Sequence, residues 1–289
     1  MENQPMGHSV HLVECPRDAM QGLSHFVPTA LKVQYINKLI QCGFDTVDFG
    51  SFVSEKAIPQ MRDTAEVLSQ LQMNDNTKLL AIVANEKGAN AAVQFDEIEY
   101  VGYPFSISET FQIRNTNSDL SRALTQVEKI HSLCAEHQKT MVVYLSMAFG
   151  NPYGEAWSPE IAFHWANRLA STGIKILALS DTIGCATPTS ITNLFSNLIP
   201  ALPSVTFGAH FHTRPDQWLS KMEAAYLSGC RRFDGALRGF GGCPMADDEL
   251  VGNMDSKHII EYFENIRVPI NVDKNLLLEA EVIGNEIFI

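Results

Sequence analysis

The sequence lacks paired cysteines, long apolar runs and low-complexity linkers. Its six cysteines are scattered without a CxxC pair, which favours a cytoplasmic protein with reduced thiols over a disulfide framework. No run of about 18 apolar residues occurs, and residues 1–10 contain no apolar signal region, so we expect neither a membrane-spanning helix nor a secretory signal. No linker or internal repeat divides the 289 residues, which indicates a single domain over residues 1–289.

Positive charge is also scarce. Lysine and arginine number 21 against 33 aspartates and glutamates, which gives a net charge of −12. This balance argues against nucleic acid and anionic membranes as partners, because phosphate groups are bound by basic patches. An anionic small molecule needs only a few local cations or helix N-termini, so it remains compatible. Neither the Walker nor the Rossmann glycine spacing is present, which argues against nucleotide hydrolysis.

Short apolar segments alternate with longer segments of helical periodicity along most of the chain. Eight of the apolar segments are typical of buried strands: Val10–Glu14, Asp45–Phe49, Lys78–Ala84, Glu97–Val101, Met141–Ser146, Lys175–Ser180, Val205–Phe211 and Arg231–Leu237. Strands that alternate with helices indicate a parallel sheet, because parallel neighbours need a crossover connection.

The segments between these strands predict helices, several of which begin near a proline, whose missing N–H costs least in the first turn. The predicted helices are Pro28–Gln41, Asn85–Gln94, Asn117–His137, Pro159–Ser171, Pro188–Leu198, Pro215–Leu227 and Ser256–Glu264. Eight strand–helix units in a chain of this length favour a closed (β/α)8 TIM barrel over an open doubly wound sheet. The last segment, Asp273–Ile289, is expected to form an extra C-terminal helix.

A barrel of this kind places its active residues at the carboxyl ends of its strands, and unusual polar residues occur at five of the predicted ends. These are Glu14–Asp18 after the first strand, Asp48 and Ser51 at the second, Ser180–Thr182 at the sixth, His210–His212 at the seventh and Arg238–Pro244 after the eighth. Together they predict one functional site at this end of the barrel.

The His210-x-His212 pair is the most informative local signal. Residues two apart on a strand point to the same face, so both imidazoles can ligate one divalent cation. Asp18 is the best candidate for a third ligand, and a carboxylate with two imidazoles suits an ion of the Mg, Mn or Zn type. The alternative is two half-buried histidines with ordinary hydrogen bonds.

Arg17 is the candidate electrophile, because a fixed guanidinium can stabilise an enolate oxygen or hold a carboxylate; a surface salt bridge is the alternative. Asp48 and Asp181 are expected to orient Arg17 or relay protons, although Asp181 could instead cap the turn that follows its strand. Cys243 lies on a glycine-rich segment and is a candidate acid or base on a mobile loop.

Over residues 8–265 several motifs occur in the same order as in a known family. The motifs are Cys15–Gln21, Ser51–Ser54, Pro59–Met61, Ser180–Gly184, His210–His212, Gly241–Pro244 and Gly252–Asn253. In this order they resemble the 3-hydroxy-3-methylglutaryl-CoA lyases of the DRE-TIM metallolyase superfamily. The resemblance implies a metal-dependent retro-Claisen cleavage of 3-hydroxy-3-methylglutaryl-CoA, or of a close 3-hydroxyacyl-CoA analogue, to acetyl-CoA and acetoacetate.

The resemblance also implies a role for each matching residue. Asp18, His210, His212 and Asn253 would hold a divalent cation, most often Mg or Mn. Arg17 would stabilise the enolate, Cys243 would be the catalytic loop thiol, and Cys243 or His210 would return the proton. The acyl-CoA substrate would be bound by Arg17, Gln21 and Ser51. We also expect a homodimer.

Two departures from the family pattern lie near the expected site. Asp48 stands where the family usually has Glu, one methylene longer. After His212 the family usually continues Asp-Thr-Tyr-Gly, whereas this chain has Thr213–Asp216. Arg214 in that segment is a candidate partner for the carboxylate of the substrate, or else a solvent-facing residue at the start of a helix.

Two other functions remain open from the sequence. A related aldolase or Claisen-type synthase would share the aspartate of the first strand and the histidine pair, but such synthases usually carry a long C-terminal regulatory region. No room for one follows residue 265. A non-catalytic barrel that binds a metabolite is the third possibility.

Overall fold

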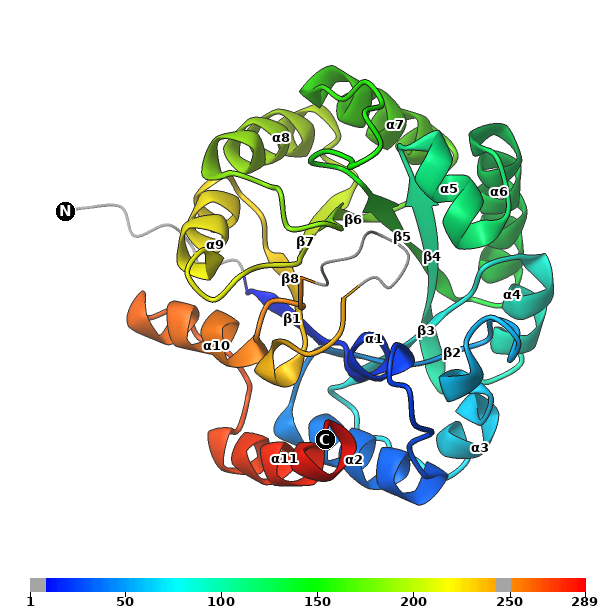
Figure 1. The fold of residues 1–289 in the computed structure, drawn as a ribbon, viewed down its shortest axis with the longest axis vertical. Helices are drawn as coiled ribbons and strands as arrows, with labels where there is room; N and C mark the ends of the chain where they lie inside the picture. The colour runs from blue at the N-terminus through cyan, green and yellow to red at the C-terminus, as the bar shows by residue number, and fades with distance from the viewer. Residues whose placement is uncertain (1–8, 243–250) are drawn as a thin grey trace.

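A computed structural model of the chain describes residues 9–242 and 251–289. Eight strands pair in sequence order and close into a barrel in which β8 pairs with β1, so the predicted (β/α)8 fold is confirmed (Figure 1). All eight pairings are parallel. The strands are β1 (His11–Glu14), β2 (Thr46–Ser51), β3 (Lys78–Ile82), β4 (Ile98–Ser106), β5 (Thr140–Ser146), β6 (Ile176–Asp181), β7 (Thr206–Phe211) and β8 (Arg232–Gly235).

Alternation along each strand separates the barrel interior from the layer beneath the helices. In β5, Val143 and Leu145 belong to the large core between strands and helices, whereas Val142 and Tyr144 belong to a small cluster inside the barrel. Residues two apart on a strand share a face. The interior side chains of neighbouring strands therefore stack in layers, and the uppermost layer opens at the carboxyl ends of the strands.

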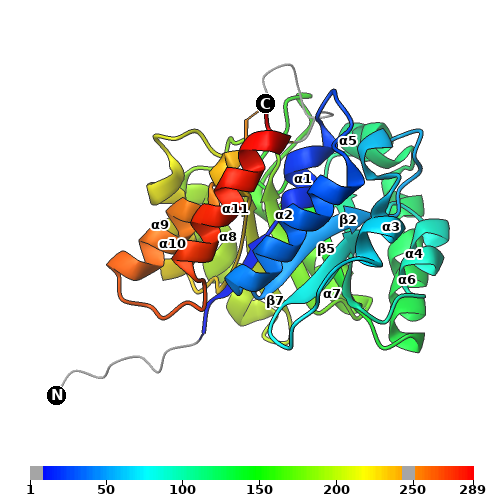
Figure 2. The ribbon, with the colours of Figure 1, turned by 90° about the horizontal axis from the view of Figure 1, so that it is seen from below.

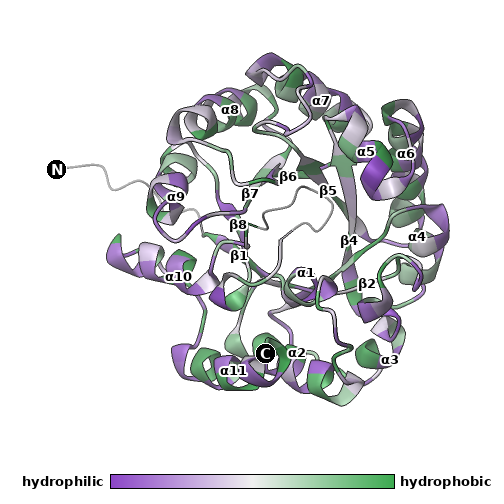
Figure 3. Cartoon of the chain, viewed as in Figure 1, coloured by the Kyte–Doolittle hydropathy of each residue, from purple (hydrophilic) through white to green (hydrophobic). Residues whose placement is uncertain are grey.

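Helices surround the barrel and bury apolar side chains against it, and Figure 3 shows hydrophilic residues interspersed with hydrophobic ones along them. They are α1 (Pro16–Gln21), α2 (Thr29–Cys42), α3 (Thr64–Leu68), α4 (Glu86–Ala92), α5 (Glu109–Thr116), α6 (Leu120–Glu136), α7 (Pro159–Ser171), α8 (Pro188–Ala201), α9 (Trp218–Leu227), α10 (Ser256–Asn265) and α11 (Lys274–Ile287). None of the helices within residues 9–242 and 251–289 is long and apolar enough to cross a membrane.

Strand β4 shows where the sequence pattern was misleading. The prediction ended at Val101, but the strand continues to Ser106 and includes Pro104, which lies opposite Tyr144 of β5. Proline normally argues against a central strand, because it cannot donate a ladder hydrogen bond. Here Gly102 and Pro104 face the barrel interior, where Pro104 lines the cavity described below.

The predicted C-terminal helix is α11, which packs along α2 on the outside of the barrel (Figure 2). Leu277, Ala280 and Ile283 are buried. Just beyond the helix, the ring of Phe288 stacks on Phe240 with centroids 4.3 Å apart. The end of the chain therefore contacts the segment that follows β8.

Glu14 at the end of β1 is a buried carboxyl group. It accepts hydrogen bonds from the backbone N–H of Leu237 at 2.8 Å and from the hydroxyl of Ser256, so it ties β1 to the segment after β8 and to the start of α10. Burial raises the pKa of Glu14 from 4.5 to about 8. The carboxyl group is therefore neutral in the folded protein at pH 6.

We expect Glu14→Gln to stabilise the protein at alkaline pH. Because the folded pKa lies above the unfolded value, the stabilisation is complete below pH 4.5 and is lost as the pH rises through 8. The difference in unfolding free energy between variant and wild type should shift by about 3 kcal/mol from pH 5 to pH 8 in favour of glutamine. Parallel thermal melts of variant and wild type at both pH values measure this shift, with Glu136→Gln on α6 as the control. A stability difference that does not change with pH would contradict the raised pKa of Glu14.

Candidate functional site

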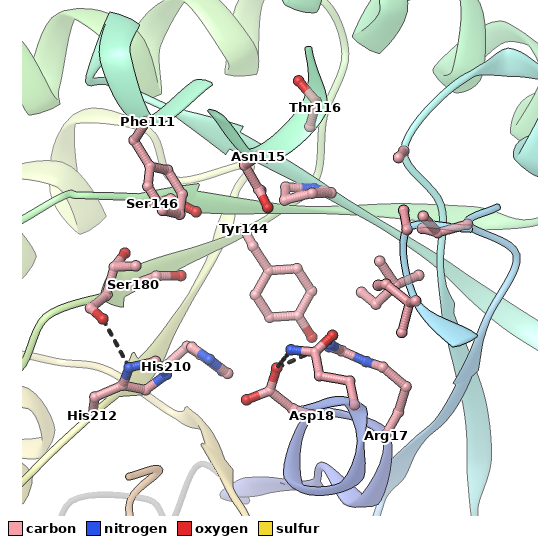
Figure 4. A pocket seen from close by; sticks show the side chains of 18 residues that line it. Arg17, Asp18, Phe111, Asn115, Thr116, Tyr144, Ser146, Ser180, His210 and His212 are labelled. Carbon is pink, nitrogen blue, oxygen red and sulfur yellow. Dashed lines mark hydrogen bonds and ion pairs between the residues drawn. The ribbon is translucent and has the colours of Figure 1, made fainter. Parts of the chain in front are cut away.

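A cavity of about 190 Å³ opens at the carboxyl ends of the strands, where the sequence placed the site. One side is polar and carries Arg17, Asp18, His210 and His212, whose side chains converge in Figure 4. The other side is formed largely by apolar and small side chains from the β2–β5 part of the barrel. These are Val53, Ala57, Ile58, Ile82, Ala84, Pro104 and Phe111.

Asp18, His210 and His212 form a three-residue group that can hold a metal ion. One ligand atom from each lies within 4.8 Å of the others, and all three residues are buried. Asp18 reaches the group because α1 begins at Pro16, directly after β1, so its first turn lies over the barrel mouth. The histidines project from β7 at the predicted same-face spacing.

Hydrogen bonds set the orientation of both imidazoles. His212 Nδ1 lies 2.9 Å from the carbonyl oxygen of Thr182, and His210 Nδ1 lies 3.2 Å from Asp234 Oδ2. Because carbonyl and carboxylate oxygens only accept, each Nδ1 is the donor, and each neutral imidazole therefore keeps a lone pair on Nε2. Two Nε2 lone pairs beside a carboxylate are a donor set that fits a divalent cation.

Asp18 is held as a carboxylate. Its Oδ1 accepts from Arg17 Nη1 at 2.9 Å and from Gln21 Nε2 at 2.7 Å. Burial alone would raise the pKa of Asp18, but the charges of Arg17 and of the two histidines outweigh it and lower the pKa to about 2. A carboxylate that stays ionised suits a metal ligand, because protonation would compete with the cation.

Asp48 orients Arg17, as the sequence predicted. Arg17 Nε lies 3.2 and 3.1 Å from the two oxygens of Asp48, and Nη2 lies 2.5 Å from Oδ2. Burial raises the pKa of Asp48 to about 6 despite the opposing charge of Arg17. Arg17 Nη1 is occupied by Asp18 and Gln21. Among the described residues one N–H of Nη2 has no acceptor, so it is available to a substrate oxygen.

Asn253 reaches the site through a short strand-like pairing with the end of β7. Its Nδ2 donates to Asp18 Oδ2 at 2.7 Å and to the carbonyl oxygen of Phe240 at 3.0 Å. The side chain thus supports Asp18 directly, and ligation through its amide oxygen stays a prediction. The contact also explains the glycine at 241, because a Cβ there would lie 2.7 Å from Asn253 Nδ2.

The structure does not bring Ser51 and Asp181 into the cavity lining within the described residues. Ser51 Oγ donates to the carbonyl oxygen of Ile82 at 3.2 Å and so shapes the turn after β2. Asp181 faces away from the barrel interior, accepts from Lys221 Nζ at 2.6 Å and accepts from the backbone N–H of Ala186 at 3.0 Å. Its position matches the alternative role, which was to cap the turn after the strand.

The roles of two further predicted residues, Arg214 and Cys243, stay predictions. Arg214 is exposed and is not among the described residues that line the cavity, so its contact with the carboxylate of the substrate remains a prediction. Cys243 lies outside the described residues. Its role as the loop thiol is therefore a prediction too, although Gly241, two residues before it, lies beside Asp18 and Asn253.

Sequence reasoning missed Tyr144 and Asp234. The Tyr144 ring meets His210 edge-on with centroids 5.4 Å apart, and burial raises the pKa of its hydroxyl well above the usual value. Both residues lie within predicted strands. The signal that could have found them is the strand period, since Tyr144 shares a face with Ser146, and Asp234 shares one with Arg232.

Known proteins are similar to this chain in sequence and in fold. The HMGL-like family model matches residues 11–283. A Pseudomonas aeruginosa protein, 3-hydroxy-3-isohexenylglutaryl-CoA/hydroxy-methylglutaryl-CoA lyase, is 30% identical over 272 residues, which cover 94% of this chain and 90% of that protein.

Solved structures of similar proteins have the same fold. A hydroxymethylglutaryl-CoA lyase from Pseudomonas aeruginosa aligns with a TM-score of 0.90 and 29% identity over 97% of this chain and 93% of that one. An HMG-CoA lyase from Acinetobacter baumannii, in complex with coenzyme A and 3-methylmalate, aligns with a TM-score of 0.88 and 29% identity over 94% and 88%. The chain belongs to the HMGL-like family.

Proposed function

We propose that this protein is a divalent-metal-dependent carbon–carbon lyase. Its substrate would be 3-hydroxy-3-methylglutaryl-CoA, or a close 3-hydroxyacyl-CoA analogue, and its products acetyl-CoA and acetoacetate. The observation that carries the proposal is the convergence of Asp18, His210 and His212 beside a guanidinium fixed by Asp48. The substrates named for the relatives and the coenzyme A bound to one of them support an acyl-CoA substrate.

The cation we propose is Mg or Mn, held by Asp18, His210 and His212 with Asn253 beside them. When bound, it would lower the pKa of the tertiary hydroxyl of the substrate. A base takes the hydroxyl proton, the bond between C2 and C3 breaks, and its electron pair passes to the thioester carbon unit as an enolate. The hydroxyl oxygen becomes the ketone of acetoacetate.

Arg17 and a proton donor complete the reaction. The free N–H of Arg17 Nη2 is suited to the enolate oxygen, where charge develops. Asp48 keeps the guanidinium still, so no reorganisation is needed when that charge appears. Cys243 is our proposed donor of the proton that converts the enolate to acetyl-CoA, with His210 as the alternative.

The activity can be tested with purified protein and 3-hydroxy-3-methylglutaryl-CoA in the presence of Mg²⁺ or Mn²⁺. We expect release of acetyl-CoA and acetoacetate in equal amounts, and no release without a divalent ion. Thioesters of altered chain length, assayed in wild type and in Arg214→Ala, locate the contact with the carboxylate. Cleavage of a free 4-hydroxy-2-oxo acid, together with no cleavage of any thioester, would favour the aldolase function instead.

A homodimer in the cytoplasm completes the proposal. Scattered cysteines without paired spacing support a reducing compartment, and the exposed apolar residues Leu278 and Val282 of α11 support contact with a second copy. Relatives carry both cytoplasmic and mitochondrial names, so fractionation of the source cells decides the compartment. Light scattering during gel filtration decides the oligomeric state.

A further inference from the structure

Asp234 of β8 lies behind His210, inside the barrel. Its side chain is fully buried, and its Oδ2 lies 3.2 Å from His210 Nδ1. Its other oxygen, Oδ1, has no hydrogen-bond partner among the described residues. A buried carboxylate of this kind needs a positive neighbour, because an unpaired charge in the interior is strongly unfavourable.

Arg232 supplies that neighbour. It precedes Asp234 by two residues, points to the same interior face, and is only 2% exposed. Its Nε lies 4.0 Å from Asp234 Oδ1, and its guanidinium lies over the ring of Tyr100. Gly208 on β7 leaves space for the Arg232 side chain, because a Cβ at position 208 would come within 3.2 Å of it. The two buried charges therefore balance one another.

The arrangement links three residues in one direction. The charge of Arg232 lies beside Asp234 without a hydrogen bond, Asp234 accepts from His210 Nδ1, and His210 also belongs to the group formed with Asp18 and His212. Since the carboxylate cannot donate, it selects one tautomer of the imidazole. Carboxylates in this position orient metal-binding histidines and raise their basicity.

Cys15 offers a competing explanation. Its thiol, His210 and Asp234 also have ligand atoms within 4.8 Å of one another, so they could hold an ion of their own. The positive charge of Arg232 beside Asp234 opposes a second cation there, because both would lie in a region of low dielectric constant. His210 Nδ1 would also have to give up its proton.

We propose that Asp234, whose charge is balanced by Arg232, is a positioning residue that holds His210 with Nε2 directed at the cation site. The proposal rests on the cation site of the proposed function, but not on the identity of the substrate. It predicts a specific protonation state in the wild-type protein and a loss of metal affinity when the carboxylate is removed.

The first test needs no substitution. Nitrogen NMR of uniformly ¹⁵N-labelled wild-type protein, with the signal assigned through its correlations to the ring protons of His210, should show His210 protonated on Nδ1. A His210 proton on Nε2 overturns the proposal. Because this measurement uses the native chain, it decides the matter even if a variant fails to fold.

The second test is Asp234→Asn, with Mn²⁺ binding measured by calorimetry on the purified protein. We expect the dissociation constant to rise by about 10-fold or more, as for other residues that support a metal ligand. The matched control is Asp45→Asn. Asp45 is a partly exposed carboxylate near the other end of the barrel, where it accepts from the N–H of Leu12 and does not touch His210.

The outcomes separate this proposal from the proposed function. Wild-type Mn²⁺ affinity in Asp234→Asn overturns the positioning role, whether or not the protein cleaves a thioester. Weakened binding confined to Asp234→Asn supports the role even if no thioester is cleaved. A second equivalent of metal in the wild type that disappears in Cys15→Ala overturns it in favour of the Cys15 group.

Discussion

Arg17→Lys should lower turnover by ~100-fold or more, the scale expected for the loss of an electrostatic catalytic group, while the protein remains folded. Lysine keeps the charge but has no planar fork, so it cannot bind both oxygens of Asp48 and still reach Asp18, Gln21 and a substrate. The measurement is kcat at saturating substrate and metal, with circular dichroism melts of the same preparations.

Arg122→Lys is the matched control for this substitution, because Arg122 is exposed and, among the described residues, forms an ion pair with Asp119 in its own turn. It should leave both turnover and melting temperature near wild type. Near-wild-type turnover in Arg17→Lys would remove Arg17 from the reaction. A fall in turnover that merely parallels a fall in the folded fraction would give it a structural role alone.

Asp18→Asn should abolish Mn²⁺ binding and lower turnover by on the order of 1,000-fold, since one change removes a metal ligand and a partner of Arg17. The amide cannot supply the negative charge that now balances Arg17 and the histidines. Exhaustive chelation of the wild type should have the same effect, reversed by Mg²⁺ or Mn²⁺. Calorimetry and steady-state assays measure both results.

The low pKa of Asp18 also predicts how the activity of the wild type depends on pH. Because its pKa is about 2, the carboxylate stays ionised through the whole range above pH 4. Loss of wild-type activity between pH 4 and 6 should therefore not trace to Asp18. Asp96→Asn, an exposed site, serves as the control, and activity that survives chelation would contradict a metal-dependent reaction.

Much of the fold follows from periodicity. The eight strands and the long helices α2, α6, α7 and α8 are apparent in the sequence because burial on one face imposes a regular spacing. Short elements leave a weaker pattern: α3 and α5 have only 5 and 8 residues and went unpredicted. The fourth strand was predicted to end at Val101, whereas β4 continues to Ser106 and the closed barrel accommodates its proline.

The site was predictable where chemistry and strand position coincide. Asp18, His210 and His212 combine ligand chemistry with strand ends, and the structure brings them together. Asp181 faces outward because its neighbours Ser180 and Thr182 occupy the inward positions, so its catalytic role stays a prediction. Asp234 was missed although the strand period places it on the same face as Arg232, and its contact with His210 depends on the register between β7 and β8.

The stacking of Phe288 on Phe240, together with the hydrogen bond between Arg238 Nη1 and Asn285, has a practical consequence for anyone purifying the protein. Ile289 is 89% exposed, so an affinity tag fused after it would begin one residue from the ring that supports the segment leading to Cys243. Added mass there can perturb catalysis without unfolding anything. A tag placed ahead of β1 emerges at the opposite end of the barrel and avoids this interference.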